Sequence, residues 1–91
     1  MKEILINIDV ENLESAANFY TEAFELNRGR RLGKDIIELT GSNCSIYLLE
    51  KKSNTQVSSA CSDRRDYLRH WTPVHLDFVV ESLSEAIVRV E

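Results

Sequence analysis

"ILINIDVENLESAANFY", residues Ile4 to Tyr20, is the stretch that decides how this chain begins to fold. Its first seven residues alternate, with isoleucine or valine at every second position and Leu5, Asn7 and Asp9 between them. A period of two is typical of a strand that lays one face on an apolar layer. We therefore predict a strand over residues 4–10, with Asn7 and Asp9 on its more polar face.

The same stretch then changes its period from two residues to 3.6. Asn12 is a residue type that favours the N-cap of a helix, because its side chain can accept a free backbone N–H. The apolar residues that follow at helical spacing are Leu13, Ala16, Ala17, Tyr20 and Phe24. This pattern predicts an amphipathic helix with one stripe on the core.

Three further strands are predicted before residue 51. The first, 26–32, is weak and is interrupted by Gly29, whereas 35–40 and 44–50 are better defined and are separated by turn-forming residues. Residues 1–50 are thus expected to form a βαβββ module. Residues 51–72 are polar, without a clear apolar period, and are interpreted as a linker or lid with a helical turn near 63–70.

The opening stretch is repeated near the end of the chain, at a shift of 80 − 10 = 70 residues. The identical pairs are Val10 and Val80, Glu11 and Glu81, Leu13 and Leu83, and Ala16 and Ala86. Ser82 takes the place of Asn12 and opens a capping box with Glu85. We therefore predict that residues 73–91 start a second module, with a strand headed by His75 and then a helix.

A complete second module would run to about residue 50 + 70 = 120, whereas the sequence stops at Glu91. About thirty residues with three strands are therefore expected to be missing. A chain that was cut short is the interpretation we favour. The alternative is a natural variant that a partner chain completes.

The order of these elements resembles the vicinal oxygen chelate superfamily, which includes glyoxalase I, bleomycin resistance proteins and extradiol dioxygenases. The resemblance is carried by "NLESAANFYTEAFEL" at 12–26, with its Phe19-Tyr20 pair, and by "VHLDFVVESLSEA" at 74–86. It implies an α+β fold in which a βαβββ module is followed by the first strand and helix of a second, incomplete module. It also implies that paired modules form a cupped sheet around a cleft.

Metal-dependent members of that superfamily place ligands on the first and last strands of each module. The resemblance puts these positions at Leu5, Tyr47 and His75, so His75 is the one good ligand that remains. Glu50 lies three residues from Tyr47 and would point to the opposite strand face. Because a divalent site usually needs three or more protein ligands, we expect no cofactor; a divalent metal held by His75 is the alternative.

The resemblance turns the polar faces of both first strands toward the cleft. The expected ligand-binding residues are Asn7, Asp9, Tyr47, His75 and Asp77, with Trp71 as an aromatic wall. A purely structural interpretation stays open. In that case His75 bonds to Tyr47 or Asp77 without touching a ligand, Asp9 is solvated at a strand end, and Trp71 packs the linker on the sheet.

The composition and charge of the chain limit the partners and the compartment that we expect. The 91 residues carry a net charge of −4, which argues against nucleic acid. No apolar run approaches the roughly 20 residues that cross a membrane. The N-terminus does not read as a signal peptide, and Cys44 and Cys61 are expected to be free thiols, so a cytoplasmic location is predicted.

Three functions follow from these observations. The first is a metal-free protein that binds a small molecule, as bleomycin resistance proteins do. The second is a metal-dependent lyase or dioxygenase that uses His75. The third is a non-catalytic module without a ligand. A homodimer is expected in each case, because unpaired strand edges favour pairing with another copy.

Overall fold

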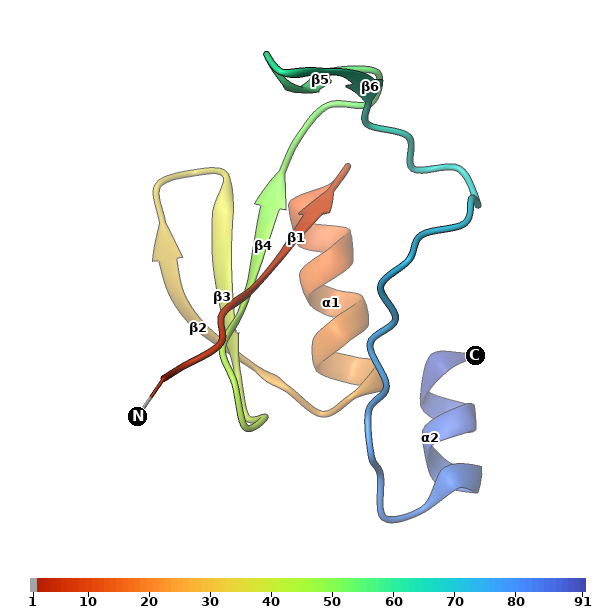
Figure 1. The fold of residues 1–91 in the computed structure, drawn as a ribbon. Coiled ribbons are helices and arrows are strands. Elements are labelled where there is room, and N and C mark those ends of the chain that lie inside the picture. The colour runs from red at the N-terminus through yellow and green to blue at the C-terminus, as the bar shows by residue number, and fades with distance from the viewer. Residues whose placement is uncertain (1) are drawn as a thin grey trace.

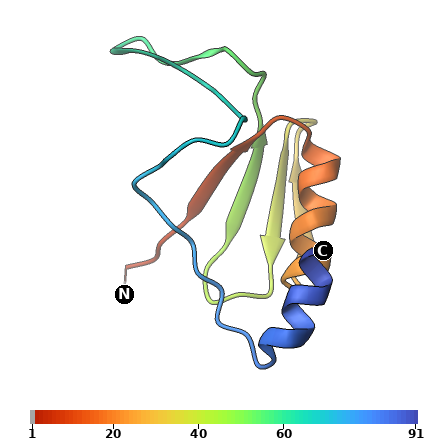
Figure 2. The same ribbon diagram turned by 90° about the vertical axis from the view of Figure 1, so that its right-hand side faces the viewer.

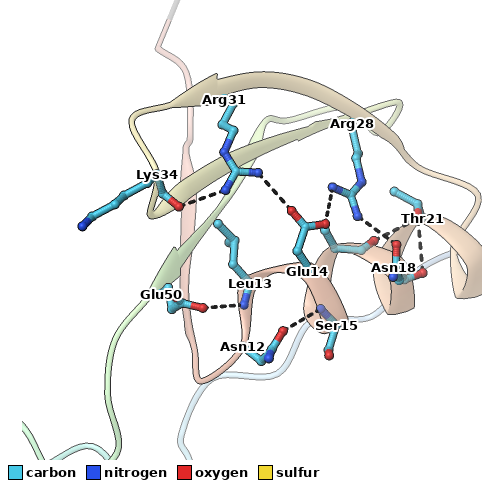
Figure 3. Close-up of polar contacts among 11 residues, drawn as sticks. Asn12, Leu13, Glu14, Ser15, Asn18, Thr21, Arg28, Arg31, Lys34 and Glu50 are labelled. Atoms are coloured by element: carbon cyan, nitrogen blue, oxygen red, sulfur yellow. Dashed lines mark hydrogen bonds and ion pairs between the residues drawn. The ribbon is translucent and has the colours of Figure 1, made fainter.

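The strand and helix predicted from the opening stretch both form. The computed structural model describes residues 2–91, in which β1 (Ile6–Val10) leads directly into α1 (Leu13–Ala23). The Asn12 side chain accepts the Ser15 N–H at 2.9 Å, as expected of an N-cap. The N–H of Leu13, the first residue of the helix, donates to a Glu50 carboxylate oxygen at 2.9 Å (Figure 3).

Four strands form a single mixed sheet (Figure 1). After α1 the chain runs through β2 (Asn27–Leu32), β3 (Ile36–Thr40) and β4 (Ile46–Glu50), and the spatial order is β1-β4-β3-β2. Neighbouring strands are antiparallel except for β1 and β4, which are parallel. The predicted order of a strand, a helix and three further strands is therefore confirmed.

The core lies between α1 and one face of this sheet. Ala17 and Leu13 on the helix meet Leu39, Ile46 and Leu48 on the central strands, and all five are buried. α1 lies on this face of the sheet. No helix covers the opposite face, which is called here the open face (Figure 2). Alternation in β1 and β4 places Asn7, Asp9, Tyr47 and Leu49 on the open face.

Ion pairs tie β2 to the exposed side of α1. Glu14 accepts from Arg28 at 2.8 Å and from Arg31 at 3.0 Å (Figure 3). The hydrogen bond from Arg28, followed by that from Arg31, lowers the pKa of Glu14 below its ordinary value. All three side chains are solvated, so this network positions the strand more than it stabilises the fold.

The expectation of a helical turn near 63–70 is wrong. Residues 51–72 contain a β-hairpin, made of β5 (Gln56–Ser58) and β6 (Cys61–Arg64), which projects past the open-face side of the sheet (Figure 2). Arg65 fixes its base, since its backbone pairs with Asn54 and Thr55 and its Nε donates to Asp9 of β1 at 2.8 Å. The hydrogen bonds of Arg65 to residues distant along the chain thus favour a hairpin in this segment over a helical turn.

The helix predicted for the second copy of the repeat forms. Ser82 caps α2 (Leu83–Val90) and accepts the Glu85 N–H, with backbone angles close to those of Asn12. Arg89 anchors α2 to the end of α1 through the Ala23 carbonyl at 3.0 Å. Apart from Ala86, the apolar stripe of α2 is largely exposed, because the described sheet face that could bury it is already covered by α1.

The strand expected at the start of the second copy does not form. Residues 74–80 belong to no β-ladder of the structure over residues 2–91. They are attached through Phe78, which stacks on Phe24 at a centroid distance of 3.9 Å. A strand exists only through its hydrogen-bonded neighbour. In the first copy that neighbour is β4, which pairs with β1, and the described residues contain no equivalent strand beside 74–80.

Within residues 2–91, no helix is long and apolar enough to cross a bilayer.

We predict that Asn12→Ala lowers the free energy of unfolding by about 1 kcal/mol, because the Ser15 N–H loses its acceptor. Urea denaturation followed by circular dichroism measures the change. Asn43→Ala is the matched control, since its exposed side chain bonds to no residue of the described range. Equal losses in both variants would contradict the capping role.

Candidate functional site

Three polar side chains meet across the middle of the open face. The strand register places Tyr47 of β4 between Asn7 of β1 and Glu38 of β3. Tyr47 is partly buried and Glu38 is buried, whereas Asn7 is exposed. Two of these residues, Asn7 and Tyr47, were predicted from the sequence as ligand-binding residues.

Glu38 is the centre of a hydrogen-bonded cluster. Its Oε1 accepts the backbone N–H of Arg30 at 3.0 Å and Arg30 Nε at 3.3 Å. Its Oε2 accepts Arg30 Nη2 at 3.3 Å and the Tyr47 hydroxyl at 3.0 Å. The backbone hydrogen bond from Arg30, and then the side-chain bonds of Arg30 and Tyr47, lower the pKa of Glu38 to about 2.

Gly29 makes room for this cluster. The pairing of β2 with β3 is irregular between Arg28 and Arg31, which is where the Arg30 N–H turns toward Glu38. A methyl group on Gly29 would lie 2.5 Å from Glu38 Oε1. The glycine that weakened the strand prediction for 26–32 is thus the residue that lets a carboxylate approach the strand.

An apolar cavity adjoins the cluster. This open-face cavity has a volume of about 210 Å³ and is lined by Leu5, Asn7, Leu32, Ile36, Tyr47 and Leu49. Four of its six lining residues are leucine or isoleucine. The cavity can therefore hold an apolar body against the sheet, with the side chains of Tyr47 and Asn7 among its walls.

Asp9 also lies on the open face but is already engaged. Its carboxylate is 2.8 Å from Arg65 Nε, and Arg65 further donates to the Gln56 carbonyl at 2.8 Å. Asp9 is not among the residues that line the open-face cavity. Through Arg65 it holds the base of the β5–β6 hairpin, so it is not simply solvated at a strand end.

The structure places His75 and Asp77 apart from Tyr47. Both line a second cavity of about 490 Å³, whose walls include Ile6, Ile46 and the stacked Phe78. Leu5 lines the open-face cavity and His75 the second one, so the two matching positions of the repeat do not face a common hollow here. Trp71 is 79% exposed and lines neither cavity.

Metal-ligating side chains do not cluster within the described residues. Residues 2–91 hold no group of three histidine, cysteine, aspartate or glutamate side chains that could share an ion. On the open face, both carboxylate oxygens of Glu38 already accept hydrogen bonds, from Arg30 and Tyr47.

Sequence reasoning missed Arg30 and Glu38. One signal was present: Glu38 is the only charged residue in the strand Ile36–Thr40, and a carboxylate amid apolar neighbours needs a partner. The identity of that partner was not readable, because Arg30 is one of three arginines in β2.

Comparisons with known proteins bear on the fold. No family model and no curated protein matches this sequence. Among solved structures, the crystal structure of lactoylglutathione lyase from Agrobacterium tumefaciens is similar, with a TM-score of 0.58 and 15% sequence identity. The match covers 97% of this chain and 66% of that enzyme, so this chain spans less than two thirds of its length. The chain thus has an α+β fold of the glyoxalase type, as the resemblance to the vicinal oxygen chelate superfamily predicted.

Proposed function

We propose that this protein binds a small organic molecule in the open-face cavity and does so without a metal. The observation that carries the proposal is the combination of an apolar floor with a fixed polar group beside it. Leu5, Ile36 and Leu49 supply the floor, and Tyr47 is held in place by Arg30 and Glu38. Binding sites for small molecules commonly combine apolar walls with a few fixed polar groups.

Small aromatic compounds titrated into ¹⁵N-labelled protein test this proposal. We expect shifts concentrated at Asn7, Tyr47 and Leu49, and at least a tenfold loss of affinity in Leu49→Arg, because a cation would occupy the apolar floor. Leu68→Arg is the control, since Leu68 is 78% exposed and lies outside the cavity. Shifts that gather around the second cavity, or equal affinity in Leu49→Arg, would contradict the proposal.

Two observations support the metal-free part of the proposal. The Glu38 carboxylate is already bonded to Arg30 and Tyr47, and residues 2–91 hold no group of three metal-ligating side chains. Elemental analysis of protein purified without added metal should find no divalent ion in stoichiometric amount. A bound ion that only strong chelators remove, together with its loss in His75→Ala, would overturn this part and favour a metal-dependent reaction.

A homodimer is the assembly we propose. Apolar side chains stand exposed along residues 74–80 and α2, among them Val79, which is fully exposed, and Val88. Exposed apolar patches of this kind mark association surfaces in soluble proteins. Sedimentation at high protein concentration should show a dimer, and a single monomeric species would refute it.

The cytoplasm is the compartment we propose. Cys44 and Cys61 are both free thiols and both partly buried. Free thiols persist in reducing compartments. Fractionation of cells that express the protein tests this directly.

A further inference from the structure

The β5–β6 hairpin is attached to the sheet through polar bonds at its base. Arg65 Nε donates to Asp9 Oδ2 at 2.8 Å, and Arg65 Nη1 donates to the Gln56 carbonyl at 2.8 Å. The Tyr67 hydroxyl donates to the Lys51 carbonyl at 2.7 Å. This last bond joins the segment that enters the hairpin to the segment that leaves it, so the base is closed on both sides.

Apolar packing contributes little to the position of the hairpin. Residues 56–64 are exposed except for Cys61, which is partly buried. Segments with few buried apolar contacts move relative to a core at low cost in free energy. The hairpin can therefore change its direction while its base stays bonded to Asp9.

The base of the hairpin lies at the rim of the open-face cavity. Asp9 follows Asn7 by two residues on the same face of β1, and Asn7 lines the cavity. The hairpin itself projects past the open-face side of the sheet (Figure 2). In this structure no residue of 51–72, a range that is fully described, lines the cavity. The hairpin thus stands beside the cavity and is joined to the sheet at its edge.

The open-face cavity leaves one side of a ligand uncovered. Two of its walls, Leu5 and Leu32, are 58% and 41% exposed. Sites for small molecules commonly bury about 70–90% of the ligand surface. An apolar molecule on this floor therefore needs a second surface above it to leave water.

The hairpin has the reach and the side chain to supply that surface. A strand rises about 3.3 Å per residue, so the four residues from Thr55 to Ser59 reach about 13 Å. The four residues from Asp9 back to Leu5 span the same length. If the hairpin lay along β1, Val57 would be level with Asn7. Val57 is 51% exposed in the structure, so it is free to make this contact.

We propose that the β5–β6 hairpin is a lid of the open-face cavity, which closes by turning about the Asp9–Arg65 ion pair and covers an apolar ligand with Val57. This inference rests on the proposed binding function. Closure brings the exposed Val57 and the exposed leucines of the cavity together on the two sides of the ligand, and burial of apolar surface favours the closed arrangement.

Disulfide trapping in the ligand-free protein tests the closing motion. Val57→Cys and Asn7→Cys are combined in a protein that also carries Cys44→Ser and Cys61→Ser, and the protein is oxidised at low concentration. We expect an intramolecular disulfide, which requires Cα atoms within about 7 Å of each other. Val57→Cys with Glu22→Cys is the matched control, because Glu22 is exposed on α1, and it should form none. Absence of the first disulfide, or equal yields in both proteins, overturns the inference.

Toluene titrated into ¹⁵N-labelled protein tests whether the hairpin covers the ligand. Val57→Asp should weaken the binding of toluene by about 3–10-fold, because a carboxylate replaces the apolar contact. Val74→Asp should keep the wild-type affinity, since Val74 is 71% exposed and lies outside the cavity. Equal affinity in Val57→Asp overturns the inference.

The two measurements separate the lid from the binding function. If toluene shifts open-face resonances but no disulfide forms, the lid alone is overturned. If the disulfide forms but toluene shifts no open-face resonance, the proposed function fails, and the role of the hairpin as a lid fails with it.

Discussion

Leu39→Ala is expected to lower the free energy of unfolding by about 3–5 kcal/mol, the range for truncating a fully buried leucine. Leu39 lies on β3 in the cluster that joins the sheet to α1, so its removal leaves a cavity at the centre of the fold. A chain of this size is stabilised by roughly 5–14 kcal/mol in total. The substitution should therefore remove a large share of the stability, and urea denaturation followed by circular dichroism measures it.

Leu68→Ala provides the matched comparison for this effect. It removes the same atoms from a side chain that is 78% exposed. We expect a change within about 0.5 kcal/mol, as for ordinary surface substitutions. A loss below 1 kcal/mol in Leu39→Ala would show that the interface between α1 and the sheet is not the main source of stability.

Acid should destabilise the wild-type protein more than Glu38→Gln. The pKa of Glu38 is lowered from 4.5 to about 2 in the folded state. A group with a depressed folded pKa contributes stability that is fully present above its unfolded pKa and is lost as pH falls through the folded value. The contribution should thus be complete above about pH 5 and decline between pH 4.5 and pH 2.

Urea midpoints measured from pH 7 to pH 2 test this dependence. The urea midpoint of the wild type should be higher than that of Glu38→Gln at pH 7, and the two midpoints should converge toward pH 2. Glu14, whose pKa is also lowered, is present in both proteins and cancels in the difference. Glu22→Gln, an exposed control on α1, should run parallel to wild type. A constant gap between wild type and Glu38→Gln across the range would contradict the assignment.

Local pattern was sufficient for the first half of the fold. The alternation of Ile6, Ile8 and Val10 and the cap at Asn12 predicted β1 and α1, and both are present. Even the rejection of Glu50 as a substitute for Tyr47 agrees with the structure, since Glu50 lies on the helix side and caps α1 at Leu13. These features depend on periods of two and 3.6 residues, which neighbouring residues carry by themselves.

Tertiary structure decided the content of the site. The sequence alone identified Asn7 and Tyr47 as candidates, but it did not pair Glu38 with Arg30, because that contact depends on strand register and on the irregularity at Gly29. It also placed His75 beside Tyr47, whereas the structure separates them into two cavities. The repeat correctly predicted α2 from Ser82 onward, yet residues 74–80 formed no strand. A helix closes its hydrogen bonds within its own segment, whereas a strand, and any site built across strands, depends on partners that are distant along the chain.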